Sequence, residues 1–369
     1  ITFTWASGCP PPLAADTSGR SAADPARRSG DKLTGGWQRP ERAVARTEHF
    51  VFLLAFGMGI SVAAFRLAFL QVCALSCLAC SPAQEHQSID LLLESAVANG
   101  GVPGAIAVAA NSDGVIYEGA FGKSDIQSNS DMSIDSILQI YSMTKPITSV
   151  AIMQLVEKGD IDLDAAASEY LPMLADVQVL DGFDENGAPL LRTPKTDVTV
   201  RQLLTHTSGY VYEIWNANAA RYAQTGGVES IFNNGDGFLA APLAFDPGTN
   251  WEYGISTDVL GEIIAAVAEQ SLEEYFRIHV FAPLNMNDTS FHLAEQDLPR
   301  LATAYSRSGN GDLTALPARS NTASLRGGSG LVSTAPDYIR FLRALLNGGE
   351  LDGARILNAE TVELMAKNQ

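Results

Sequence analysis

Residues 142–158 constrain the fold most, because the pattern Ser142-Met143-Thr144-Lys145 opens a segment that is apolar on nearly every side. A helix that is apolar all round is buried rather than surface-lying. Gly159 stands where a glycine ends a helix, and Pro146 falls in the first turn, where its missing N–H costs little. The sequence therefore predicts a buried helix with a serine and a lysine at its start.

Ser142 and Lys145 have the chemistry of a nucleophile and its base. Positions i and i+3 share one face of a helix, so the Lys145 amine can reach the Ser142 hydroxyl. Burial favours the neutral amine, which acts as a base, and the helix N-terminus offers N–H groups to an oxyanion. The bare pattern is weak and recurs at residues 29–32. The alternative is a helix cap at Ser142 and a surface lysine at Lys145.

The composition excludes several classes of function. The first 84 residues carry eight Lys and Arg against five Asp and Glu, which leaves 16 basic and 37 acidic residues in the body. Such an acidic body argues against nucleic acid or an anionic membrane as the main partner. All four cysteines lie in the first 80 residues, so the body has no disulfide, thiol nucleophile or cysteine metal site. No metal-binding or phosphate-binding spacing occurs, and we expect no cofactor.

The first 83 residues predict export from a bacterial cell. Residues 1–48 have no helical or strand period, and we expect residues 1–57 to be a disordered lead or in-frame upstream sequence, since the chain begins with Ile. Residues 58–83 are typical of an export signal. Residues 78–81 resemble the end of a lipoprotein signal, with Cys80 as the lipid anchor, while residues 81–83 suit cleavage to a free periplasmic protein. A transmembrane anchor is the third alternative, because about 20 apolar residues span a bilayer.

Residues 86–369 are expected to form the folded domain that carries Ser142 and Lys145. Its first elements are a helix over 90–98 and a hairpin of strands 105–110 and 115–120 around a four-residue turn. Later elements are a hairpin around Asn186-Gly187, a helix capped by Ser256 or Thr257, a tight loop at 327–330, and helices over 337–346 and from Thr361.

Tyr253 is a candidate proton shuttle. It follows a Pro-Gly turn and precedes a helix, so it lies on a loop, where a phenol can pass a proton to a leaving group. The alternative is a packed aromatic side chain. His206 could join a Ser/His pair, but a hydrogen-bonded structural histidine is the preferred interpretation.

Five motifs, taken together and in order, resemble the serine β-lactamase-related hydrolases. This group includes class C β-lactamases, D-alanyl-D-alanine carboxypeptidases and family VIII carboxylesterases. The motifs are Tyr-Ser-Met-Thr-Lys-Pro (141–146), Leu-Leu-Thr-His-Thr-Ser-Gly (203–209), the Pro-Gly-Thr stretch 247–261, Ala-Pro-Leu-Asn-Met (282–286) and the Gly-Gly-Ser-Gly stretch 327–338.

The resemblance covers residues from about 89 to 369 and implies an α/β (α+β) fold. An antiparallel sheet flanked by helices would join a helical domain, with the site between them. It also implies an acyl-enzyme mechanism on a small ester or amide, with Ser142 as nucleophile, Lys145 as base and Tyr253 as proton shuttle.

This chain departs from the family pattern at two places, and both affect the expected substrate and activity. Class C β-lactamases have Tyr-x-Asn where this chain has Tyr253-Gly254-Ile255, and Ile255 cannot donate an amide hydrogen bond to a β-lactam. This favours a carboxylesterase over a β-lactamase or D-Ala-D-Ala carboxypeptidase; a non-catalytic binding or sensor module of the same fold is the other alternative. The third family motif, Lys-Thr-Gly or an equivalent, is not found before Gln369. We therefore expect the closing C-terminal strands to be missing, an unpaired edge at 105–110, and a chain that is inactive or weakly folded in a circular dichroism melt.

Overall fold

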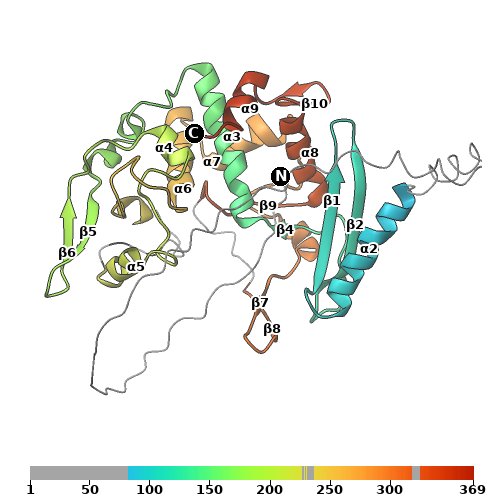
Figure 1. The fold of residues 1–369 in the computed structure, drawn as a ribbon. Coiled ribbons are helices and arrows are strands. Elements are labelled where there is room, and N and C mark those ends of the chain that lie inside the picture. The colour runs from blue at the N-terminus through green and yellow to red at the C-terminus, as the bar shows by residue number, and fades with distance from the viewer. Residues whose placement is uncertain (1–81, 227, 229, 231–236, 318–324) are drawn as a thin grey trace, which may run out of the picture. The chain divides into compact units, whose positions relative to one another are not determined.

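The computed structural model describes residues 82–369 apart from 227, 229, 231–236 and 318–324 (Figure 1). The predicted lead and the export-signal residues up to Ser81, Cys80 among them, lie outside the described residues, so their predicted roles stay predictions. Within the described part, no helix combines the length and apolar character that crossing a membrane requires.

A helix and a hairpin open the described chain. Helix α2 (Pro82–Ala98) precedes the antiparallel strands β1 (Gly104–Ala110) and β2 (Val115–Asp125), and β3 (Ser130–Asp131) pairs with β2. The turn is closed by Asn111, whose Oδ1 accepts the N–H groups of two following residues at 2.9 Å. The hairpin lies between α2 and helix α8 (Ala335–Leu346) (Figure 1). The predicted helix and hairpin are confirmed, although α2 begins before residue 90.

Strand β1 forms the edge of this sheet. The strand order is β1-β2-β3, and β1 pairs with β2 alone among the described residues. The expected unpaired edge therefore lies along β1, while the expected weak folding stays a prediction.

Helix α3 (Thr144–Lys158) lies at the centre of the core. It is entered through the short strand β4 (Leu138–Gln139) and the 3-10 turn η1 (Tyr141–Met143), and it ends at Gly159, whose φ is 80°. Its apolar side chains are buried on all sides, as the sequence predicts.

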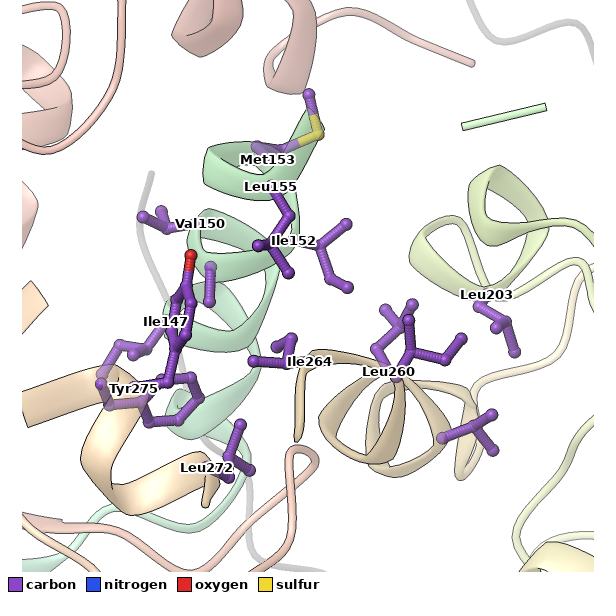
Figure 2. Packing of buried hydrophobic residues seen from close by; sticks show 14 of the residues in the cluster. Ile147, Val150, Ile152, Met153, Leu155, Leu203, Leu260, Ile264, Leu272 and Tyr275 are labelled. Atoms are coloured by element: carbon purple, nitrogen blue, oxygen red, sulfur yellow. The ribbon is translucent and has the colours of Figure 1, made fainter. Parts of the chain in front are cut away.

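Helices α6 (Ser256–Ala268) and α7 (Leu272–Phe276) pack on α3, and α4 (Val200–Leu204) packs on α6 in the same core. Figure 2 shows Leu260 and Ile264 of α6 beside the α3 side chains, with Leu203 of α4 and Tyr275 of α7 in the same cluster. This packing fixes the start of α3, where the predicted nucleophile lies.

The predicted cap of α6 is wrong. The N-cap is Ile255, and no side chain caps the helix. Ser256 already belongs to the helix and is fully buried, and its Oγ lies 2.9 Å from Ser208 Oγ. Because a buried hydroxyl needs a partner, Ser256 bonds across to the segment after α4 rather than to its own backbone.

The other elements are short and connect these parts. The predicted hairpin around 186–187 is β5 (Val179–Phe183) and β6 (Pro189–Arg192), and the last predicted helix is α9 (Ala359–Met365). Strand β9 (Val332–Ser333) pairs antiparallel with β4, which brings the segment after the 327–330 loop beside the entry to α3. The remaining elements are η2 (Ala167–Glu169), η3 (Pro172–Asp176), α5 (Ala217–Gln224), η4 (Gly237–Ala240), η5 (Arg277–Phe281), η6 (Glu295–Arg300), β7 (Tyr305–Arg307), β8 (Leu313–Ala315), β10 (Glu350–Leu351) and β11 (Ala354–Arg355).

Candidate active site

Ser142 lies in a sharply bent turn between β4 and α3. The preceding residue, Tyr141, has a φ of 45°, in the left-handed region that a bulky side chain rarely adopts. Such a conformation costs on the order of 1–2 kcal/mol and persists where the surrounding structure enforces it. One enforcing contact is the hydroxyl of Tyr338, which donates to the Met143 carbonyl at 2.9 Å. The turn presents Ser142 half-buried at the start of α3.

Lys145 is buried beside Ser142, with only 8% of its surface exposed. Its Nζ lies 3.3 Å from Ser142 Oγ, as the i, i+3 spacing predicts. The same Nζ donates to Tyr212 Oη at 3.1 Å and to the Gly328 carbonyl at 2.7 Å. Lys145 is therefore not a surface residue, and the N-cap of α3 is Met143 rather than Ser142.

These three contacts suit a lysine that acts as a base. A carbonyl oxygen only accepts, so one N–H of the amine is committed to Gly328. A neutral amine has a second N–H, which Tyr212 Oη accepts, and a lone pair. The lone pair is then left for the proton of the Ser142 hydroxyl. The arrangement can convert that hydroxyl into a nucleophile.

Tyr253 also reaches this site, from the loop before α6 where the sequence places it. Lys145 Nζ lies 4.8 Å from the centre of its ring. The Tyr253 ring packs on Tyr212, Trp215 and His206, with centroid distances of 5.6, 5.7 and 4.8 Å. The structure thus brings Ser142, Lys145 and Tyr253 together.

Tyr212 is a site residue that the sequence did not indicate. Burial, together with the nearby Asp258 carboxyl and Tyr253, raises its pKa, so the phenol is neutral around pH 7. It comes from a weakly patterned segment, and its place beside Lys145 follows from packing between segments far apart in the chain. No local signal in the sequence could have found it.

His206 packs against Tyr253 as a hydrogen-bonded structural histidine. Its φ is 58°, and its Nδ1 accepts the Gly254 N–H at 3.4 Å. Burial and the charge of Lys145 lower the pKa of His206 to about 4. The ring is therefore neutral near pH 7 and holds the loop that carries Tyr253.

The loop at 327–330 is tight, as predicted, and it packs directly on α6. A Cβ added at Gly327 would lie 2.3 Å from the Thr257 carbonyl oxygen, so only glycine fits there. Thr148 Oγ1, on α3, donates to the Gly327 carbonyl at 2.6 Å. The loop is thereby held from two helices, and it presents the Gly328 carbonyl to Lys145.

Exposed aromatic side chains lie around these groups. Trp215, which packs on Tyr212 and Tyr253, is 58% exposed, and Trp251, near His206, is 61% exposed. Tyr141, next to Ser142, is also exposed. In the residues that the structure describes, no three His, Cys, Asp or Glu side chains gather as metal ligands would.

Comparisons with known proteins agree with the fold. The sequence profile of the Beta-lactamase family matches residues 89–369. The chain belongs to this family. It is 32% identical over 295 residues to the acyltransferase mokF of Monascus pilosus, which covers 76% of this chain and 70% of mokF. It is also 32% identical over 276 residues to the lovastatin esterase of Penicillium rubens, covering 71% and 69% of the two chains.

A solved structure of another protein has the same fold. Unliganded simvastatin synthase (LovD) from Aspergillus terreus superposes with a TM-score of 0.70 at 30% identity, covering 78% of this chain and 73% of LovD. The α/β fold that the motifs imply, with small antiparallel sheets and helices, is confirmed. The chain is a serine hydrolase of the β-lactamase/transpeptidase-like fold.

Proposed function

We propose that the protein cleaves carboxylic esters of small molecules through an acyl-enzyme on Ser142, with full turnover expected in a chain that includes the third family motif. The observation that carries the proposal is the position of Lys145 Nζ, which lies 3.3 Å from Ser142 Oγ while Tyr212 and Gly328 occupy its N–H groups. Relatives named as an esterase and an acyltransferase support the same chemistry.

In the proposed first step, Lys145 takes the Ser142 proton and Oγ attacks the ester carbonyl carbon. A tetrahedral intermediate forms, and its collapse breaks the bond to the alcohol oxygen. The Tyr253 hydroxyl receives the proton from Lys145 and gives a proton to that oxygen as the alcohol leaves, so that Lys145 is again neutral. Water, or a second alcohol, then attacks the acyl-enzyme, and the proton travels the same route in reverse. Release to water gives hydrolysis, and release to an alcohol gives acyl transfer.

Two features favour esters over β-lactams. Ile255 stands where an amide would bind a β-lactam, and it is only 3% exposed. The aromatic side chains of Trp215 and Trp251 suit an apolar acyl or alcohol group. A β-lactamase or D-Ala-D-Ala carboxypeptidase is the alternative within the fold, and a non-catalytic binding module is the alternative outside catalysis.

A labelling and turnover experiment tests the proposal. A fluorophosphonate probe should label Ser142, and p-nitrophenyl butyrate should be hydrolysed faster than nitrocefin. Ser142→Ala should lose the label and at least a thousandfold of turnover. Ser29→Ala is the matched control, because Ser29 carries the same Ser-x-x-Lys pattern, and it should change neither. Labelling without ester turnover would favour the binding module, and faster nitrocefin turnover would overturn the ester assignment.

We also propose that residues 58–83 direct export of the protein. The product is either a free periplasmic protein or a lipoprotein anchored to the membrane. The sequence at 78–81 supports lipidation of Cys80. Metabolic labelling with palmitate in a bacterial host tests it. The parent protein should carry the label, and Cys80→Ser should lose it. A parent protein without label would rule out a lipid anchor at Cys80.

A further inference from the structure

Asp258 is a buried carboxyl group that the proposed mechanism does not use. It lies in the first turn of α6 and is 2% exposed. A carboxyl group at such a depth costs free energy unless it is bonded or paired. Its Oδ2 has no hydrogen-bond partner among the described residues. Hydrogen bonds to both carboxyl oxygens therefore do not explain why this side chain is buried.

The side chain of Asp258 contacts the loop that holds Lys145. Asp258 Oδ1 accepts the Gly328 N–H at 3.2 Å. A Cβ added at Gly328 would lie 2.2 Å from Asp258 Oδ2, so this residue sits directly on the carboxyl group. The carbonyl of the same Gly328 accepts Lys145 Nζ at 2.7 Å. A single residue therefore connects Asp258 to the lysine.

The charged and titratable groups that act on Asp258 are Lys145 and Arg326, and Asp258 in turn acts on the phenol of Tyr212. Burial raises the pKa of Asp258, while the two positive charges oppose that rise. The bond from Gly328 is available in either protonation state, because Oδ1 is an acceptor in both. The contact with the loop does not depend on the charge of the carboxyl group.

We propose that Asp258 is a positioning residue for Lys145. By accepting the Gly328 N–H, it orients the Gly328 carbonyl toward Nζ, and this holds the amine beside Ser142 Oγ. The inference rests on the proposed roles of Ser142 and Lys145. It differs from a purely structural role at the start of α6, where an acidic residue also favours the helix dipole.

Substitutions at Asp258 separate the acceptor from the charge. Asp258→Asn keeps an acceptor oxygen and the side-chain size, and its kcat for p-nitrophenyl butyrate should stay within about threefold of the parent. Asp258→Ala removes the acceptor, and kcat should fall about 10- to 100-fold with little change in KM, since small displacements of catalytic groups have effects of this size. The rate of fluorophosphonate labelling at Ser142 should fall in parallel. Asp258→Leu, which keeps the number and branching of the side-chain heavy atoms without an acceptor, gives the same test if the alanine variant does not fold.

Asp337→Ala is the matched control, because Asp337 is also a buried acid in the first turn of a helix and accepts from Thr289 Oγ1 at 2.9 Å. It should lower the melting temperature and leave kcat unchanged. Parent kcat in folded Asp258→Ala or Asp258→Leu, or an Asp258→Asn variant as slow as these, would overturn the inference. These outcomes would contradict the role of Asp258 alone. The proposed function itself would fail through a different result, namely a Ser142→Ala variant that keeps both the label and the turnover.

Discussion

Lys145 contacts two tyrosine side chains through different groups. Tyr212 offers its hydroxyl oxygen at 3.1 Å, whereas Tyr253 presents the face of its ring, with its centre 4.8 Å from Nζ. A hydroxyl that accepts from the amine orients it, while a ring face stabilises the positive charge that the amine gains when it takes the Ser142 proton. The hydroxyl groups of Tyr212 and Tyr253 therefore make different contributions to catalysis at Lys145, and these can be measured separately.

Removing each hydroxyl distinguishes these contributions. Tyr253→Phe keeps the ring under Lys145 and loses the proton shuttle, and kcat should fall by at least about 100-fold. Tyr212→Phe loses one hydrogen bond to the lysine, and a loss of about tenfold follows from the ordinary worth of such a bond. Steady-state hydrolysis of p-nitrophenyl butyrate measures both. Tyr305→Phe, which removes a hydroxyl bonded to the Ile126 N–H, is the control and should not change kcat. A larger loss in Tyr212→Phe than in Tyr253→Phe would exchange the two roles.

His206 predicts a pH dependence of stability. Its pKa is lowered to about 4 in the folded chain from an ordinary 6.5. Between these values the unfolded chain binds more protons, so the stability contribution is full above pH 6.5 and is lost as the pH falls to about 4. The loss amounts to up to about 3 kcal/mol. Asparagine tolerates the φ of 58° at this position and does not titrate, so His206→Asn should lack this loss.

Urea unfolding at pH 7.5 and 4.5 measures the effect in both proteins. The decrease in unfolding free energy should be about 2–3 kcal/mol larger in the parent than in His206→Asn. Other titrating groups, such as His279, are present in both proteins and cancel in the comparison. Equal decreases would show that the buried imidazole does not drive acid destabilisation.

Elements with a local signal were predictable from the sequence, and contacts between elements were not. The hairpin at 111–114 and the buried helix after Ser142 follow from turn residues and apolar periodicity, which act within a few residues. The cap of α6 was mispredicted because Ser256 bonds to Ser208, 48 positions away. Tyr212 was missed for the same reason, since its partner Lys145 lies 67 positions earlier. Nucleophile and base were found because they share one helical turn.

The contact between α6 and the 327–330 loop predicts how a methyl group added at Gly261 would change stability and kcat. Gly261 is in the middle of α6, and alanine in a helix interior is ordinarily up to about 1 kcal/mol more stable than glycine. Here an added Cβ would lie 2.9 Å from the Gly327 backbone nitrogen. Overpacking of this kind costs about 1–3 kcal/mol. Gly261→Ala should therefore lower the unfolding free energy and, by moving the loop away from Lys145, lower kcat.

Chemical denaturation and ester kinetics of Gly261→Ala check both effects. Gly309→Ala is the matched control, because nothing lies within 4 Å of its added Cβ. Its stability should stay within about 0.5 kcal/mol of the parent, as for ordinary surface substitutions. A more stable Gly261→Ala with parent kcat would contradict the close packing of helix and loop.

Among the described residues, the sheet of β1, β2 and β3 has covered faces and an open edge along β1. Helices α2 and α8 lie on either side of the β1–β2 hairpin, while β1 has β2 as its single partner strand in the described part of the chain. The sequence of β1 is Gly-Ala-Ile-Ala-Val-Ala-Ala, with no charge and no proline. An uncharged, apolar edge strand is a template for pairing with another chain.

This edge predicts concentration-dependent self-association, which a charge on β1 should suppress. Ala109 is the exposed position of the strand, opposite Tyr117, so a lysine there places a charge at the edge without entering the core. Sedimentation velocity over a range of concentrations should show larger species for the parent and a shift to monomer for Ala109→Lys. Ala109→Thr, which suits a strand and carries no charge, should behave as the parent. A parent that stays monomeric at every concentration, or equal shifts in the lysine and threonine variants, would mean that the β1 edge does not direct association.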